Sequence, residues 1–116
     1  MVDEPTPGSG AMEGRGAEGD MPKGYFLSEV DVSNPAAYEA YRTRVLPTVE
    51  KFGGRFLVRG GEPRAIEGGA FASRVIVIEF DSPEQVMAWY NCPEYQAIVP
   101  IRHANSKTRA ACLVGA

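Results

Sequence analysis

Two glycine pairs enclose the segment "RFLVR" and confine any strand there to residues 55–59. Gly53-Gly54 precedes the segment, and Gly60-Gly61 follows it, with Pro63 shortly after. Glycine adopts left-handed backbone conformations without steric penalty, so the first pair is typical of a helix end and the second of a turn. The sequence therefore predicts a helix, a short strand and a loop over residues 60–72.

Three other segments have the apolar alternation or the β-branched content of strands. They are residues 23–32, 73–80 and 107–114, of which "SRVIVIEF" is the clearest. Asn34 and Pro35 have the form of a helix start. The apolar residues that follow recur at spacings of three and four, whereas Pro47 predicts a bend or break near residues 43–46.

Ser82 and Pro83 open a second helical segment, which Pro93 interrupts. Cys92 would occupy the cap position of its second part. The resulting order, βαββαβ, predicts an α+β fold of the ferredoxin-like type, in which a four-stranded antiparallel sheet carries both helices on one face.

The first 22 residues differ in composition from the rest of the chain. They contain five acidic residues, one arginine, five glycines and three prolines, with no aromatic residue. Such a segment cannot bury enough apolar surface to offset the entropy lost on ordering. We interpret residues 1–22 as a disordered tail and residues 23–116 as a single domain.

The domain itself has little net charge. Residues 23–116 keep 11 of the 12 basic and 10 of the 15 acidic residues, a balance of +1. This argues against nucleic-acid binding, and no apolar run approaches the length of about 20 residues that spans a membrane. Cys92 and Cys112 have no CxxC spacing, which favours reduced thiols in a cytoplasmic protein. His103 is the sole histidine, so we expect no multi-histidine metal site within one chain. We also expect no bound cofactor, because the enzyme hypothesis given below needs none.

The face of the sheet without helices is predicted to be mixed in character. If Phe56 and Val58 point toward the helices, then Arg55, Leu57 and Arg59 point the other way. The same alternation adds Glu29, Glu79 and Arg109 together with apolar neighbours. Two hypotheses stay open: a solvated face with charge pairs across strands, or a face that packs on a second copy and encloses a cavity. A register shift of one residue would invert the assignment.

Two long segments, "NPAAYEAYRTRVLPTVEKFGGRFLVRGGEP" and "RVIVIEFDSPEQVMAWYNCPEYQAIVPIR", resemble a family known as a domain of unknown function, number thirteen-thirty. The family belongs to the dimeric α/β-barrel superfamily. The resemblance implies a ferredoxin-like protomer that forms a homodimer sheet to sheet, and it implies no established reaction. Superfamily neighbours include cofactor-independent monooxygenases, muconolactone-type isomerases, polyketide cyclases and haem-dependent peroxidase-like enzymes.

Arg59 and Glu79 are the first catalytic candidates, because both are predicted on the helix-free face of neighbouring strands. In a dimer cavity Arg59 would bind a carboxylate, enolate or phenolate, and Glu79 would act as a base or orienter. The alternative is a structural ion pair. His103 is a further acid–base candidate, and the alternative there is a cation placed favourably at a helix C-terminus.

Trp89, Tyr95 and Arg102 are candidates for substrate binding. The two aromatic residues flank the helix break, where they could form a pocket wall or belong to the core. Arg102 shares one helix face with Tyr95, Ile98 and Val99. The leading functional hypothesis is a small cofactor-independent enzyme that acts on an aromatic or enolisable acid. The alternative is a non-catalytic small-molecule-binding or assembly module.

Overall fold

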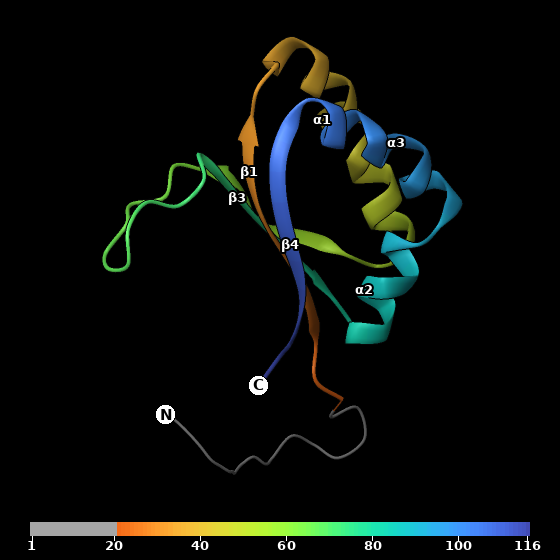
Figure 1. The fold of residues 1–116 in the computed structure, drawn as a ribbon. Helices are drawn as coiled ribbons and strands as arrows, with labels where there is room; N and C mark the ends of the chain where they lie inside the picture. Colours follow the sequence, from red (N-terminus) through yellow and green to blue (C-terminus); the bar gives the residue numbers. More distant parts are fainter. Residues whose placement is uncertain (1–20) are drawn as a thin grey trace.

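A computed structural model describes residues 21–116, which form one layer of helices on one face of a β-sheet (Figure 1). The elements are β1 (Gly24–Val32), α1 (Pro35–Lys51), β2 (Arg55–Gly61), β3 (Arg74–Phe80), α2 (Pro83–Tyr90), α3 (Pro93–Ala104) and β4 (Ser106–Val114). The predicted tail lies outside the described residues except for Met21 and Pro22. No helix in the described part is long and apolar enough to cross a membrane.

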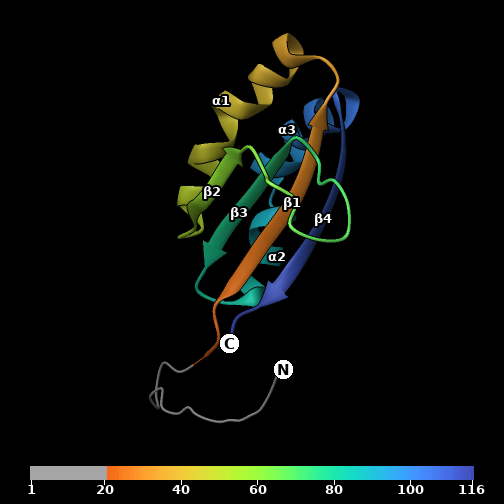
Figure 2. The same cartoon turned by 90° about the vertical axis from the view of Figure 1, so that its left-hand side faces the viewer.

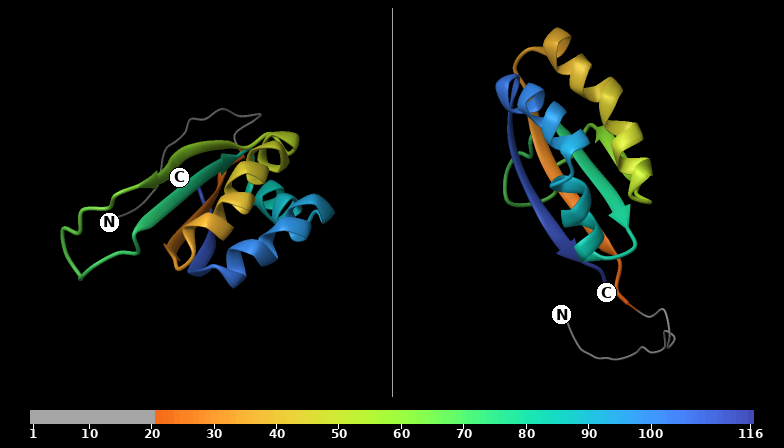
Figure 3. Two further views of the ribbon diagram at one scale, coloured as in Figure 1. Left: turned by 90° about the horizontal axis from the view of Figure 1, so that it is seen from above. Right: turned by 90° about the vertical axis from the view of Figure 1, so that its right-hand side faces the viewer.

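The sheet has the order β2-β3-β1-β4, with every neighbouring pair antiparallel. This arrangement confirms the predicted ferredoxin-like α+β fold. The helices cover one face, and Figure 2 shows the opposite face, which we call the open face, without helices. Figure 3 shows the same two layers from above and from the helix side, with the loop between β2 and β3 extending away from the helices.

The strand β2 departs from regular alternation. Phe56 pairs with Ile78 and Val58 with Val77, so Leu57 is left out of the pairing, and a second irregularity lies between Arg59 and Gly61. A bulge of this kind adds one residue to one strand and moves the following side chains to the other face. Gly60, with φ +79°, supplies the left-handed conformation at the second irregularity.

The helix α1 runs without a break through Pro47, so the predicted break near residues 43–46 is wrong. Pro47 and Thr43 both lie on the exposed side of the helix. The hydrogen bond that proline removes is therefore on the side where water can satisfy the free carbonyl. Val45 and Val49, on the opposite side, are buried and hold the helix against the core.

The break between α2 and α3 and the caps on either side follow the sequence signals. Ser82 accepts a hydrogen bond from the Gln85 N–H, and the Cys92 Sγ accepts one from the Tyr95 N–H. Gly53 ends the α1 region with φ +76°. Between the layers, Trp89, Phe80, Tyr95 and Phe26 form a buried aromatic cluster, with centroids of Trp89 and Tyr95 4.2 Å apart.

Candidate functional site

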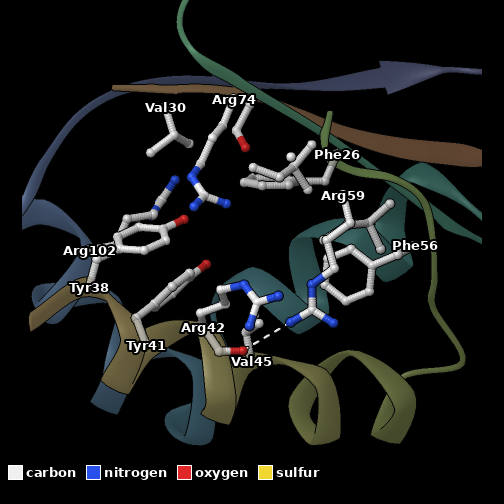
Figure 4. Close-up of a pocket in the computed structure, with 14 residues that line it drawn as sticks. Phe26, Val30, Tyr38, Tyr41, Arg42, Val45, Phe56, Arg59, Arg74 and Arg102 are labelled. Carbon is white, nitrogen blue, oxygen red and sulfur yellow. Dashed lines mark hydrogen bonds between the residues drawn. The ribbon is translucent and has the colours of Figure 1, made fainter. Parts of the chain in front are cut away.

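A pocket lies between the helix layer and the sheet, where α1, α3, β1, β2 and β3 converge (Figure 4). We call it the arginine pocket, because four arginines from four different elements line it. The lining residues are Phe26, Ser28, Val30, Tyr38, Tyr41, Arg42, Val45, Phe56, Arg59, Gly60, Arg74, Ile76, Ile78 and Arg102. None of them is acidic.

Arg102 lies at the buried end of the arginine pocket. The residue is only 3% exposed, and its Nε has no hydrogen-bond partner among the described residues. The guanidinium carbon lies 5.7 Å from the ring centroid of Tyr41. No carboxylate in residues 21–116 forms an ion pair with Arg102. A buried cation without an ion-pair partner is costly, and a bound anion would offset that cost.

The three other arginines reach the pocket from its sides. Arg74, at the start of β3, lies with its guanidinium carbon 5.6 Å from the ring centroid of Tyr38. Arg59 of β2 lies 4.3 Å from the ring centroid of Phe56 and donates a hydrogen bond of 2.9 Å to the backbone carbonyl of Arg42. Arg42 of α1 forms an ion pair with Glu39. In Figure 4 the Arg74 and Arg102 side chains lie on the Tyr38 side, that of Arg59 lies beside Phe56, and that of Arg42 lies between Tyr41 and Arg59.

Tyrosines supply neutral hydrogen-bond donors to the same pocket. Burial raises the pKa of Tyr38, against the opposing effect of all four arginines. Burial also raises the pKa of Tyr41 to about 12. Both hydroxyls therefore keep their protons at neutral pH, which suits them to stabilise an anion and not to act as bases.

Tyr41 connects the pocket to the core. Its hydroxyl lies 2.8 Å from the hydroxyl of Tyr95, which is fully buried. Burial raises the pKa of Tyr95 as well, so one hydrogen bond joins two protonated hydroxyls. Tyr95 thus holds Tyr41 in place from behind and does not itself line the pocket.

The arginine pocket is narrow. The space between its side chains measures about 440 Å³ including the part that opens to solvent. Within this space there is room for about two water molecules. Arg42 and Arg59 are both exposed, so these two long side chains lie at the solvent side of the pocket.

Arg59 and Glu79 do not meet, which corrects the sequence-based placement. The bulge in β2 turns Arg59 toward the helices, and Val58 instead faces the open side. Glu79 remains on the open face, where its Oε1 lies 2.6 Å from the Arg55 guanidinium and its Oε2 accepts a hydrogen bond of 3.0 Å from Tyr25. This hydrogen bond raises the pKa of Tyr25. Within the described protomer, Arg59 therefore lines the arginine pocket and Glu79 does not.

The remaining candidates are scattered. Trp89 is fully buried in the core, where its Nε1 donates a hydrogen bond of 3.0 Å to the Thr48 hydroxyl. His103 is exposed near the end of α3 and lines none of the pockets described for this chain. Of the six candidates, only Arg59 and Arg102 line the arginine pocket.

Five residues of the pocket were not predicted as site residues: Ser28, Tyr38, Tyr41, Arg42 and Arg74. Tyr38 and Tyr41 recur at the helical spacing expected of core residues, and in the structure they both pack in the core and line the pocket. Their spacing in the sequence therefore does not distinguish core residues from pocket residues. Arg102 carried the one usable signal, a charge within the apolar stripe of a helix. Among residues 21–116, no three His, Cys, Asp or Glu side chains cluster as metal ligands do, and the arginine pocket offers donors suited to anions.

Comparisons with known proteins agree with this fold. Similar structures include the RPA0582 protein of unknown function from Rhodopseudomonas palustris, with 20% identity over 80% of this chain and 82% of that one, at a TM-score of 0.67. SnoaB, a cofactor-independent oxygenase from Streptomyces nogalater, has 13% identity over 82% of this chain and 94% of that one, at a TM-score of 0.54. A proposed antibiotic biosynthesis monooxygenase from Caulobacter crescentus has 11% identity over 83% of this chain and 92% of that one, at a TM-score of 0.59.

At sequence identities of 11–20%, the similarity to these structures shows that the fold is shared and nothing more. The comparison with curated proteins gives no match. The profile of one protein family, described as "Domain of unknown function (DUF1330)", matches residues 23–116. The chain therefore belongs to the DUF1330 family.

Proposed function

We propose that this protein binds a small aromatic or enolisable acid in the arginine pocket and stabilises its anionic form, as a cofactor-independent enzyme does. The observation that carries the proposal is Arg102, a buried guanidinium with an unpartnered Nε in a pocket without acidic residues. A bound carboxylate, enolate or phenolate would supply the missing acceptor. The fold shared with SnoaB, a cofactor-independent oxygenase, is consistent with the proposal.

In this proposal no general base removes the substrate's proton; the positive charges of the pocket favour its loss instead. No carboxylate or histidine of residues 21–116 lines the arginine pocket, and Tyr38 and Tyr41 hold their protons. However, four positive charges around a bound phenol or enol lower its pKa, because they favour the charged form. A substrate acidic enough would then ionise to water on binding, and the arginines would hold the electron-rich anion that reacts next.

The probe 4-nitrophenol tests this proposal directly, because its phenolate absorbs visible light and its phenol does not. The expected result is saturable binding with a lowered pKa of the bound probe, so that the phenolate signal grows at a pH where the free probe is protonated. Arg102→Met is expected to abolish the shift. Arg44→Gln, on the exposed side of α1 and outside the pocket, is the matched control and is expected to preserve it.

Failure of the probe to bind, or an equal pKa shift in Arg102→Met, would contradict the proposal. Oxygen consumption and product analysis with phenolic and keto acids then separate catalysis from binding. Absence of a general base is the observation that favours the second candidate, a non-catalytic binding module. That candidate predicts an intact pKa shift without turnover.

We also propose that the open face packs against a second copy of the chain. Apolar side chains cross all four strands of this face, from Leu57 (49% exposed) and Val58 on β2 through Val77 and Leu27 to Leu113 (42% exposed) on β4. The ion pairs Arg55–Glu79 and Arg109–Glu29 lie among them. An apolar face of this extent with internally paired charges is suited to a self-complementary interface.

A further inference from the structure

The arginine pocket contains more positive charge than one acid group can balance. Arg42 has Glu39 as its partner, with Nη1 and Oε2 3.1 Å apart. Arg59, Arg74 and Arg102 have no carboxylate partner within residues 21–116. Three uncompensated guanidinium groups around one small space repel each other, and a single bound carboxylate would leave two of them unbalanced.

The arginines of the pocket form two groups. Arg102 and Arg74 lie against the rings of Tyr41 and Tyr38, whose centroids are 5.6 Å apart. Arg59 lies against the ring of Phe56 and is tied to the Arg42 carbonyl on α1. Figure 4 shows a space between these two groups, and Arg42 and Arg59 are exposed whereas Arg102 is buried.

Apart from Ser28 and the hydroxyls of Tyr38 and Tyr41, the rest of the lining is apolar. Phe26, Val45, Ile76 and Ile78 supply it, and no acidic side chain interrupts it. Such a lining accepts the hydrocarbon part of a ligand while the arginines at either side bind its charged ends. A compact anion such as phosphate would reach one group of arginines and leave the apolar surface unused.

We propose that the natural ligand is a dianion with two separated acid groups on a short apolar or aromatic body, of the dicarboxylic acid class. This inference rests on the proposed function, because it concerns the same pocket. One acid group binds Arg102 and Arg74 at the buried side. The second binds Arg59 and Arg42, which lie at the solvent side of the pocket.

Calorimetric titration at constant ionic strength tests the inference with probes that differ in charge number and spacing. Benzoate is the monoanion, isophthalate and terephthalate are the separated dianions, and inorganic phosphate is the compact dianion. We expect one of the separated dianions to bind about tenfold more tightly than benzoate, the gain typical of one additional charged hydrogen-bonded pair.

Substitutions of single arginines test which arginines bind each acid group of the ligand. Arg59→Gln is expected to weaken binding of the tighter dianion at least about fivefold more than binding of benzoate. Arg102→Met is expected to weaken both. Arg74→Gln is a second variant at the buried side in case Arg102→Met does not fold, which circular dichroism shows. Arg44→Gln is the control and is expected to change neither affinity.

Equal affinity for benzoate and both separated dianions would overturn this inference and leave the proposed function standing. Tighter binding of phosphate than of either dicarboxylate would also overturn it, in favour of a compact dianion. If no probe binds, and 4-nitrophenol does not bind either, both the inference and the proposed function fail.

Discussion

Arg59 and Glu79 lie on opposite faces of the sheet although they belong to neighbouring strands. Arg55 pairs with Glu79, and in a regular strand Arg59, four residues on, would share the face of Arg55. The bulge at Leu57 shifts the alternation by one residue, so that Arg59 pairs with Ile76 and faces the helices. Glu79 instead forms its ion pair with Arg55.

This separation predicts how substitutions combine. Because Arg59 and Glu79 share no partner, the effects of Arg59→Gln and Glu79→Gln on the free energy of unfolding are expected to add within about 0.3 kcal/mol. Arg55→Gln and Glu79→Gln should be coupled by about 0.5–1 kcal/mol, since the pair is partly exposed. Urea unfolding of the single and double variants at one protein concentration measures both cycles. Stronger coupling in the Arg59–Glu79 cycle would show that the bulge is misplaced.

The unpartnered Arg102 predicts a gain in stability when its charge is removed. Arg102→Met keeps an unbranched apolar stem, shortens the side chain and removes a buried cation, so the ligand-free protein is expected to become about 1–3 kcal/mol more stable. Urea unfolding in a buffer free of phosphate and carboxylates measures this change. Arg44→Met, at an exposed position of α1, is the control and should change stability by less than about 0.5 kcal/mol. A destabilised Arg102→Met protein would mean that the guanidinium has a structural partner.

The Tyr41–Tyr95 pair predicts a loss of stability in alkaline solution. Burial raises the pKa of Tyr41 from 10 to about 12, so the unfolded chain releases this proton at lower pH than the folded protein. The contribution of Tyr41 to stability is complete below pH 10 and disappears as the pH rises to about 12, with a loss of up to about 3 kcal/mol. Urea unfolding at pH 9, 10 and 11 measures the slope.

Tyr41→Phe provides the comparison for this pH dependence. It is expected to lower stability at neutral pH by about 1 kcal/mol, because Tyr95 loses a partner, and to flatten the slope above pH 10. An unchanged slope would mean that Tyr41 ionises alike in the folded and unfolded states.

The hydrogen bond between Trp89 and Thr48 predicts that Thr48 supports the core. Thr48→Val leaves the buried indole N–H without an acceptor and is expected to lower stability by about 1–3 kcal/mol. Thr43→Val, on the exposed side of the same helix, should have an effect below about 0.5 kcal/mol. Thermal unfolding followed by Trp89 fluorescence measures both. Equal effects would argue that the indole has found another acceptor.

The proposed packing of the open face predicts a dimer. Size exclusion with light scattering is expected to give twice the chain mass of 12.5 kDa. Val77→Glu places a carboxylate in the middle of the open face and should yield a monomer, because burying that charge is unfavourable. Leu46→Glu, at an exposed position of α1, should remain dimeric. A monomeric wild-type protein at micromolar concentration would contradict the proposal.

The amino-acid sequence determined the succession of elements because the responsible signals are local. Glycine at positive φ ends α1, proline and serine start α2, and apolar periodicity separates the strands from the helices. The break before Pro93 and the cap at Cys92 were predictable for the same reason. The site was harder to predict, and Arg102 stood out only as a charge within an apolar stripe. One local signal was misleading: Pro47 suggested a break in α1, which the burial of Val45 and Val49 overrides.

Only the tertiary structure decided which side chains share a pocket. Arg42, Arg59, Arg74 and Arg102 come from α1, β2, β3 and α3, and no local rule relates positions so distant in the chain. The bulge in β2 has the largest effect, since one extra residue against β3 moves Arg59 from the open face to the arginine pocket. Strand pairing sets that register through contacts between chain segments, which a pattern of alternation within one strand does not contain.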